Sequence, residues 1–211
     1  MKVAVSYLKS DDYKKCIEAI NDTSADLLHV DMCDGKYVET KNFTISEILK
    51  LLPVSKKQLD IHLMVEDPDK YIDDLSLLNA CTITFHKLGS INPMETINHI
   101  KSVGLQVGMA INPDEEIDTI KEYLPYLDLV LIMSVVPGKG GQAFMSEVLP
   151  KVDKLNELKK DYHFFIGIDG GINGSTISQV NGVDLVISGS YVTTSLDYEE
   201  AIRSLRWVKN N

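Results

Sequence analysis

The chain has 211 residues, 44% of them hydrophobic, which is enough for one large domain or two small ones around a substantial core. Its formal net charge of -10 argues against nucleic acid as a partner, because nucleic acids select basic faces. The sequence holds no apolar run of about 18 residues, the length of a membrane span, so we expect no membrane partner.

The three cysteines, Cys16, Cys33 and Cys81, are too few and too scattered for a disulfide framework or a four-cysteine zinc site. The first residues follow a strand-like pattern and lack the long apolar region of a secretory signal. We therefore expect a cytoplasmic location. An acidic chain can still bind an anionic small molecule, because local backbone N–H groups hold such ligands.

Short β-rich runs alternate with helix-like stretches along the chain. Helical spacing appears first at Tyr13, Cys16, Ile17 and Ile20. Several stretches open with a cap-type residue before a proline, as in Asn92-Pro93. We predict strands at 2–6, 26–32, 58–65, 80–86, 106–111, 127–135, 163–169 and 184–188. The predicted helices are 11–20, 45–52, 68–78, 92–103, 114–123, 146–159, 175–180 and 198–208.

Eight strand-then-helix units in a chain of this length favour a closed (β/α)₈ TIM barrel, an α/β fold, as a single domain over residues 1–211. An open doubly wound sheet is also built from alternating strands and helices, and it stays as the alternative fold. In a barrel, the active site lies at the C-terminal ends of the strands.

Metal-competent side chains fall at these strand ends. His29 and Asp31 are two apart in the second strand and so share a face, His62 lies near the end of the third, and Asp169 closes the seventh. Each alone is equally explained as a structural residue. Together, at equivalent ends of three strands, they favour a site for a divalent metal. Imidazole and carboxylate ligands without a thiolate leave Zn²⁺, Fe²⁺, Mn²⁺ and Co²⁺ open.

Glycine-rich turns follow the last three strands, at 137–142, 170–174 and 188–190. Any one of these segments, taken alone, is equally explained as an ordinary tight turn. Three in succession indicate a phosphate cradle built from backbone N–H groups, and Lys139 is either a solvated tip or a residue that steers an anion. Met64, Met109 and Met133 also fall at strand ends, where methionine usually serves core packing. Of these, Met64 and Met133 are the candidates for an apolar lid over the metal.

Seven segments, in order along nearly the whole chain, resemble the ribulose-phosphate 3-epimerase family: 28–35, 60–65, 84–86, 108–113, 133–142, 168–172 and 188–190. The resemblance implies a (β/α)₈ barrel, one divalent metal ion, a homo-oligomer, and inversion of a ketose phosphate at C3 in carbohydrate metabolism. The resemblance thus implies the reaction of the pentose phosphate pathway that converts D-ribulose 5-phosphate to D-xylulose 5-phosphate.

Matched residue by residue, the family's metal ligands fall on His29, Asp31, His62 and Asp169, and its acid/base pair falls on Asp31 and Asp169. Its N-terminal serine matches Ser6, and its phosphate contacts fall on Gly140, Gly141, Gly171, Gly189 and Ser190. Inversion next to a carbonyl removes a proton from one face and delivers one to the other through an enediolate. Carboxylates on the second and seventh strands are expected to flank the barrel mouth in this way.

The chain departs from the family's usual pattern near the mouth. The segment Lys36-Tyr37-Val38-Glu39-Thr40 replaces His-Phe-Val-Pro-Asn, and Cys33 replaces a methionine. These changes leave open a 3-epimerase of a hexulose phosphate such as allulose 6-phosphate. A decarboxylase or aldol-type synthase would usually present a lysine where His62 stands. A non-catalytic sugar-phosphate sensor would need the cradle but no acid/base pair.

Overall fold

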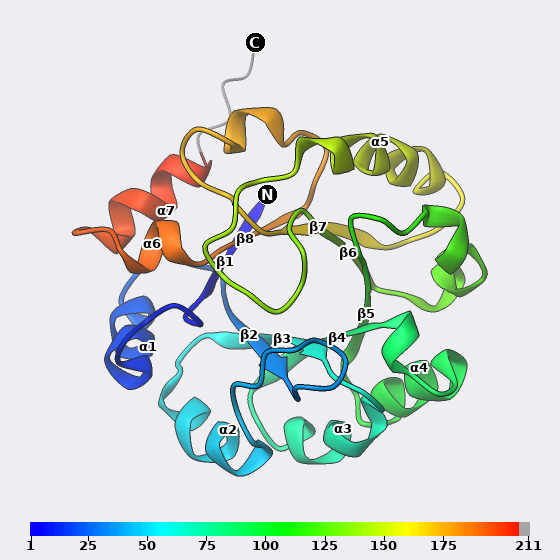
Figure 1. Cartoon of the computed structure of the whole chain (residues 1–211), viewed down its shortest axis with the longest axis horizontal. Coiled ribbons are helices and arrows are strands. Elements are labelled where there is room, and N and C mark those ends of the chain that lie inside the picture. Colours follow the sequence, from blue (N-terminus) through cyan, green and yellow to red (C-terminus); the bar gives the residue numbers. More distant parts are fainter. Residues whose placement is uncertain (207–211) are drawn as a thin grey trace.

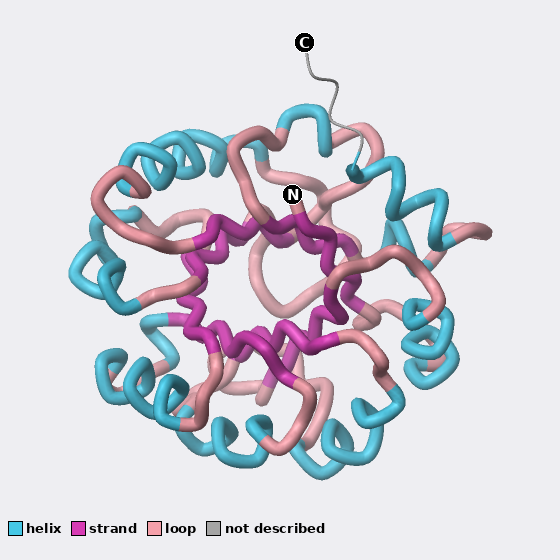
Figure 2. Tube along the Cα trace, turned by 180° about the vertical axis from the view of Figure 1, so that it is seen from behind, coloured by secondary structure: helices cyan, strands magenta, loops and turns pink. Residues whose placement is uncertain are grey.

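The computed structural model describes residues 1–206 and closes eight parallel strands into one barrel with helices outside it (Figures 1 and 2). Each strand pairs with the next in the sequence, and the last pairs with the first. The predicted (β/α)₈ barrel is therefore confirmed, and the open sheet is wrong. The strands are β1 (Lys2–Ser6), β2 (Leu27–Cys33), β3 (Gln58–Met64), β4 (Ala80–His86), β5 (Gln106–Ile111), β6 (Leu129–Met133), β7 (Phe165–Asp169) and β8 (Leu185–Ser188).

Six helices lie close to predicted bounds: α1 (Tyr13–Asn21), α2 (Ile45–Leu51), α3 (Asp69–Ser76), α4 (Pro93–Ser102), α5 (Leu149–Leu158) and α7 (Tyr198–Arg206). A further short helix is α6 (Ser190–Thr193). Short 3₁₀ segments are η1 (Leu52–Val54), η2 (Lys87–Gly89), η3 (Ile117–Tyr126), η4 (Ser146–Val148) and η5 (Ile177–Gln179). No helix within residues 1–206 is long and apolar enough to cross a membrane. The predicted last helix extends to Val208, which lies outside the described residues.

Two of the predicted helices are wrong in type. The stretch at 114–123 falls largely on the 3₁₀ segment η3, whose last turn contains Pro125, a residue that lacks the N–H an α-helix needs. The stretch at 175–180 keeps only the three residues of η5. The short helix α6, directly after β8, was not predicted.

The barrel has two apolar layers of unequal size. Outward-facing residues of the strands, such as Val30, Ile61 and Ile83, pack against the helices in the larger core. The smaller core lies inside the barrel and comes mainly from the inward positions of β6 and β8, with Leu131 and Ile187 among its members. The corresponding positions of β2, β3 and β4 carry polar residues that are also buried: His29, Asp31, Asp60, His62, Thr82, Thr84 and His86. One wall of the interior is thus polar and the other apolar.

The start of α2 offers a direct test of the fold. The Thr44 side chain accepts the backbone N–H of Glu47, and the Glu47 carboxylate accepts the backbone N–H of Thr44, which is a complete capping box. We expect Thr44→Ala to lower the free energy of unfolding by about 1 kcal/mol, measured by urea denaturation. Thr44→Ser keeps the hydroxyl acceptor and should stay within about 0.5 kcal/mol of the parent. Equal losses in both variants would contradict the capping role.

Candidate active site

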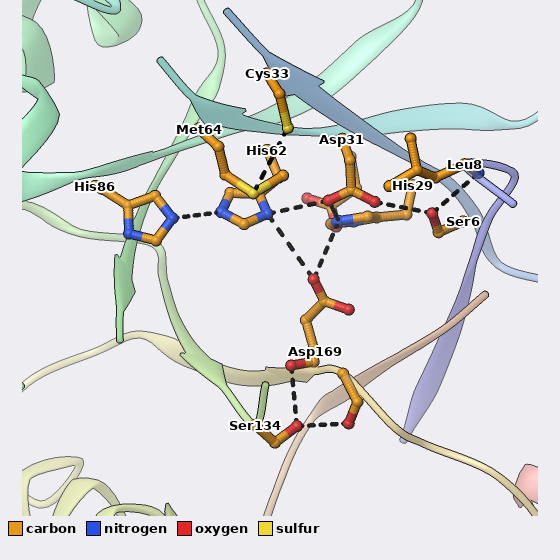
Figure 3. Close-up of polar contacts among 12 residues, drawn as sticks. Ser6, Leu8, His29, Asp31, Cys33, His62, Met64, His86, Ser134 and Asp169 are labelled. Atoms are coloured by element: carbon orange, nitrogen blue, oxygen red, sulfur yellow. Dashed lines mark hydrogen bonds and ion pairs between the residues drawn. The ribbon is translucent and has the colours of Figure 1, made fainter. Parts of the chain in front are cut away.

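The C-terminal ends of β2, β3 and β7 bring four titratable side chains together. One ligand atom from each of His29, Asp31, His62 and Asp169 lies within 4.8 Å of the others. Asp31 Oδ1 is 3.3 Å from His29 Nε2 and 3.2 Å from His62 Nδ1. Asp169 Oδ2 approaches the same two nitrogens, at 3.8 and 3.9 Å, from the opposite wall of the barrel (Figure 3). The sequence-predicted ligand set is therefore one buried cluster.

The register of the parallel strands explains this meeting. His29 is paired with Asp60 and Asp31 with His62 in the β2–β3 ladder. Since alternate residues of a strand share a face, all four point inward. The outer ring nitrogen of each histidine then has its own partner, because His29 Nδ1 lies 2.8 Å from Asp60 Oδ2 and His62 Nε2 lies 2.9 Å from His86 Nε2. These contacts fix both rings with the remaining nitrogen facing the cluster.

Hydrogen bonds to the side chain or backbone hold both aspartates in place. The Ser6 hydroxyl donates to Asp31 Oδ2 at 2.8 Å, and the Asn42 amide donates to the Asp31 carbonyl at 2.7 Å. On the other wall, the Ser134 hydroxyl donates to the backbone carbonyls of Asp169 and Gly170. The Ser6 hydroxyl therefore contacts Asp31, while Ser6 also lies next to Gly189 in the turn after β8. Both carboxyl groups keep one oxygen toward the cluster.

Burial and mutual charge drive the pKa values of the cluster apart. Burial acts to raise the pKa of Asp31, but the charges and hydrogen bonds of His29 and His62 outweigh it, and the pKa falls below its usual range. Burial, and then the charge of Asp31, raise the pKa of Asp169 to about 6. Burial opposes the charged form of His29, but Asp31 and Asp60 raise the pKa of His29 well above its usual value. Near pH 6, one carboxyl group is thus ionised and the other is partly protonated.

This donor set fits a divalent metal ion. It offers two imidazole nitrogens and two carboxylate oxygens, and the histidine tautomers needed for coordination are supplied by Asp60 and His86. Three acidic groups around His29 also leave a surplus of negative charge, which a proton on His29 or a bound cation would balance. The cluster can therefore hold a metal, as the sequence analysis expected.

A third histidine extends the polar wall. Burial, and then the neighbouring His62, lower the pKa of His86 well below its usual value, so its ring is neutral. The Tyr37 ring lies against it, with centroids 4.8 Å apart, and the Tyr37 hydroxyl accepts a hydrogen bond from the Asn112 side chain at 3.0 Å. The altered segment after Gly35 therefore covers the β4 side of the site.

A cavity of about 690 Å³ opens above the cluster. Its lining includes Asp31 and Asp169 at the base together with all of the other predicted contact residues: Ser6, Met64, Met133, Gly140, Gly141, Gly171, Gly189 and Ser190. Met109, which the sequence also placed at a strand end, is fully buried in the core between barrel and helices, because it occupies an outward position of β5. Cys33 is buried with its sulfur 4.0 Å from that of Met64.

The loop between β6 and α5 crosses the barrel mouth and reaches the turn after β7 (Figure 1). Gly171 has a φ of +66°, and a Cβ atom there would lie 2.5 Å from the backbone nitrogen of Phe144 in this loop. Only glycine permits both the left-handed backbone and the close contact. The glycines after β6 and β7 thus allow two loops to contact each other over the cavity.

Several residues of the site were missing from the sequence-based list. Asp60 stands two residues before His62 on the same strand face, and this alternation is the signal that could have found it. His86 was placed at a strand end without a role. Ser134 carried no recognisable pattern, since it acts through a neighbour distant in the sequence, Asp169, 35 residues away.

A closed (β/α)₈ barrel with titratable side chains gathered at the C-terminal ends of its strands has the organisation of barrel enzymes. The sequence model of the Ribulose-phosphate 3 epimerase family matches residues 2–193. Curated ribulose-phosphate 3-epimerases are similar over nearly the whole chain. That of Helicobacter pylori strain J99 is 38% identical, covering 99% of this chain and 98% of its own, and that of Bacillus subtilis is 35% identical, covering 99% and 100%. The chain belongs to this family and is an epimerase.

Solved structures of lower sequence identity share the fold. KGPDC from Streptococcus mutans superposes with a TM-score of 0.71 at 15% identity, over 97% of this chain and 95% of its own. The 3-hexulose-6-phosphate synthase of Salmonella typhimurium gives 0.64 at 17% identity, over 97% and 96%. At this identity the likeness shows the barrel alone.

Proposed function

We propose that this epimerase inverts C3 of D-ribulose 5-phosphate to give D-xylulose 5-phosphate, with Asp31 and Asp169 as its two acid/base residues. The main support is the position of these two carboxyl groups. They come from β2 and β7 on opposite walls of the barrel mouth and lie in one cluster (Figure 3). A substrate carbon between them would present one face to each. The family membership supports a phosphorylated sugar as the substrate.

The unequal pKa values of the pair suit this chemistry. The ionised carboxylate removes the C3 proton from one face, and the neutral carboxyl group delivers a proton to the other face. In the reverse direction the roles exchange, so the two groups titrate as a coupled pair. Ser6 holds the Asp31 carboxyl group in place, and Ser134 holds the backbone at Asp169, for both directions.

We propose that His29, Asp31, His62 and Asp169 hold one divalent ion, Zn²⁺, Fe²⁺, Mn²⁺ or Co²⁺. When bound, the ion would act as a Lewis acid that stabilises the negative charge developing on the substrate oxygens at C2 and C3. Asp60 and His86 would set the ring orientations that binding requires. Met64 and Met133 line the same space and would cover the ion with apolar surface.

The phosphate end of the substrate would lie at the outer part of the cavity. Backbone N–H groups near Gly140, Gly141, Gly171, Gly189 and Ser190 are the proposed donors, since all five residues line the cavity. This places the anion away from the two aspartates at the base. The distance keeps a doubly charged group from the buried carboxylates, which it would repel.

The test is loss of the substrate C3 proton to solvent. The protein, loaded in turn with each of the four metals, is mixed in deuterium oxide with D-ribulose 5-phosphate or allulose 6-phosphate. We expect deuterium incorporation at C3 and formation of the C3 epimer, faster with the pentulose. Faster turnover of the hexulose phosphate would reassign the substrate. Binding of both sugars without exchange would make the protein a sensor and overturn the proposal.

A homo-oligomer and a cytoplasmic location remain our predictions for this chain. The three cysteines are free thiols, which fits a reducing compartment. Light scattering on the purified protein measures its oligomeric state directly. A monomer at micromolar concentration would contradict the first prediction.

A further inference from the structure

Lys9 stands at the edge of the cavity on the loop that follows β1. A tight turn, in which Ser10 N–H donates to the Tyr7 carbonyl at 3.0 Å, places it three residues after Ser6, which contacts Asp31 at the base. Lys9 lines the same cavity as the glycine turns, although the sequence analysis assigned it no role. The residue thus reaches from the first loop of the barrel to the region proposed for phosphate.

The Lys9 side chain lies directly on the loop between β6 and α5. A Cβ atom at Gly140 would be 2.8 Å from Cγ of Lys9 and 3.2 Å from its Cε, and one at Gly141 would be 3.7 Å from the same Cε. The aliphatic stem therefore covers the bare backbone of these two glycines. Since Cε carries the ammonium, the charge is held beside the backbone stretch proposed to donate N–H groups to the substrate.

The Lys9 ammonium also has no protein partner within residues 1–206. Nearby Lys14 and Lys15 form ion pairs with Glu18 and Asp12, whereas no hydrogen bond or ion pair engages Lys9. Among the cavity residues the only other cation is Lys139, and both carboxylates, Asp31 and Asp169, lie at the base. In a chain of net charge -10, this leaves a local positive edge next to the glycine turns.

We propose that Lys9 is a binding residue for the substrate phosphate. Its ammonium completes the cradle with a charge-assisted hydrogen bond, and its stem fastens the β6–α5 loop over the cavity. The proposal rests on the proposed function for the identity of the anion. It predicts that Lys9 contributes to substrate affinity and leaves the proton transfers to the aspartates.

The test compares Lys9→Met, which keeps most of the stem, with Lys9→Ala, which removes it. Lys14→Met is the matched control, since it deletes the same charge from an exposed site outside the cavity. We expect Lys9→Met to raise KM for D-ribulose 5-phosphate about tenfold with kcat within about twofold of the parent. The inhibition constant of inorganic phosphate should rise by the same factor, and Lys9→Ala should raise KM further.

Unchanged KM and unchanged phosphate inhibition in Lys9→Met, with an active parent enzyme, would overturn the proposal. A loss of kcat at constant KM would overturn it as well, because that would place Lys9 in the chemical step. If the parent turns over no ketose phosphate, the proposed function fails first. Calorimetric binding of inorganic phosphate to the parent and to Lys9→Met then still decides the role of Lys9, since equal affinities refute it.

Discussion

Asp31→Asn and Asp169→Asn should each lower kcat for epimerisation by about a thousandfold in both directions. An amide has nearly the shape of a carboxyl group but neither takes up nor releases a proton near neutral pH, so one face of the substrate loses its acid/base partner. The measurement is the rate of C3 inversion for each epimer, with metal content determined on the same samples. Each variant is assayed only after metal reloading, because both residues are also proposed ligands.

Each variant should still exchange the C3 proton of one of the two epimers with solvent. With Asp169 replaced, Asp31 still exchanges the C3 proton that it faces, so one epimer should lose its C3 label to solvent without inversion. With Asp31 replaced, the other epimer should behave in this way. Inversion at more than about a tenth of the parent rate in either variant would contradict the two-base assignment.

Removal of the metal ion should abolish activity and lower thermal stability. At a thousandfold excess over its dissociation constant, a bound ion stabilises the folded state by about 4 kcal/mol. For a chain of this size, that corresponds to a melting temperature higher by roughly 10 °C. The experiment is dialysis against a chelator, followed by addition of each candidate metal, with activity, metal content and melting temperature recorded.

His62→Ala should reduce bound metal to background at micromolar metal, because it removes one of four ligands. His99→Ala is the matched control, since His99 also contacts two carboxylates, Asp69 and Asp73, but lies outside the barrel mouth. Metal affinity of the parent should weaken as the pH falls through the raised pKa of His29, because protons then compete for that ring. Equal metal content in His62→Ala and the parent would refute the ligand set.

The sequence predicted the repeat of strand and helix, and it predicted the polar residues at strand ends. Both predictions were possible because alternate residues of a strand lie on the same face. His29 and Asp31 share a face at any register, and the pairing with β3 then brings His62 to them. Met109 shows the limit of this reasoning, since a strand-end residue faces inward only at the correct parity. Pro125 lies two residues beyond the predicted helix 114–123, and it falls in the last turn of the 3₁₀ segment η3 that replaces this helix.

Contacts made by neighbours in space were harder to foresee. Neither Asp60 nor His86 could be assigned as the partner of a particular ring without the β2–β3 and β3–β4 registers. The closeness of Lys9 to Gly140 depends on how two loops far apart in the sequence fold over the mouth. Side chains in loops lack the fixed period of a strand, so their partners do not follow from spacing.

The loop between β6 and α5 is pinned at three places: by Val38 against Gly138, by Lys9 against Gly140, and by Gly171 against Phe144. These contacts come from the segments that follow β1, β2 and β7, so three separate parts of the chain bear on one loop. A substitution in any of these segments would therefore change the shape of the substrate cavity through the β6–α5 loop.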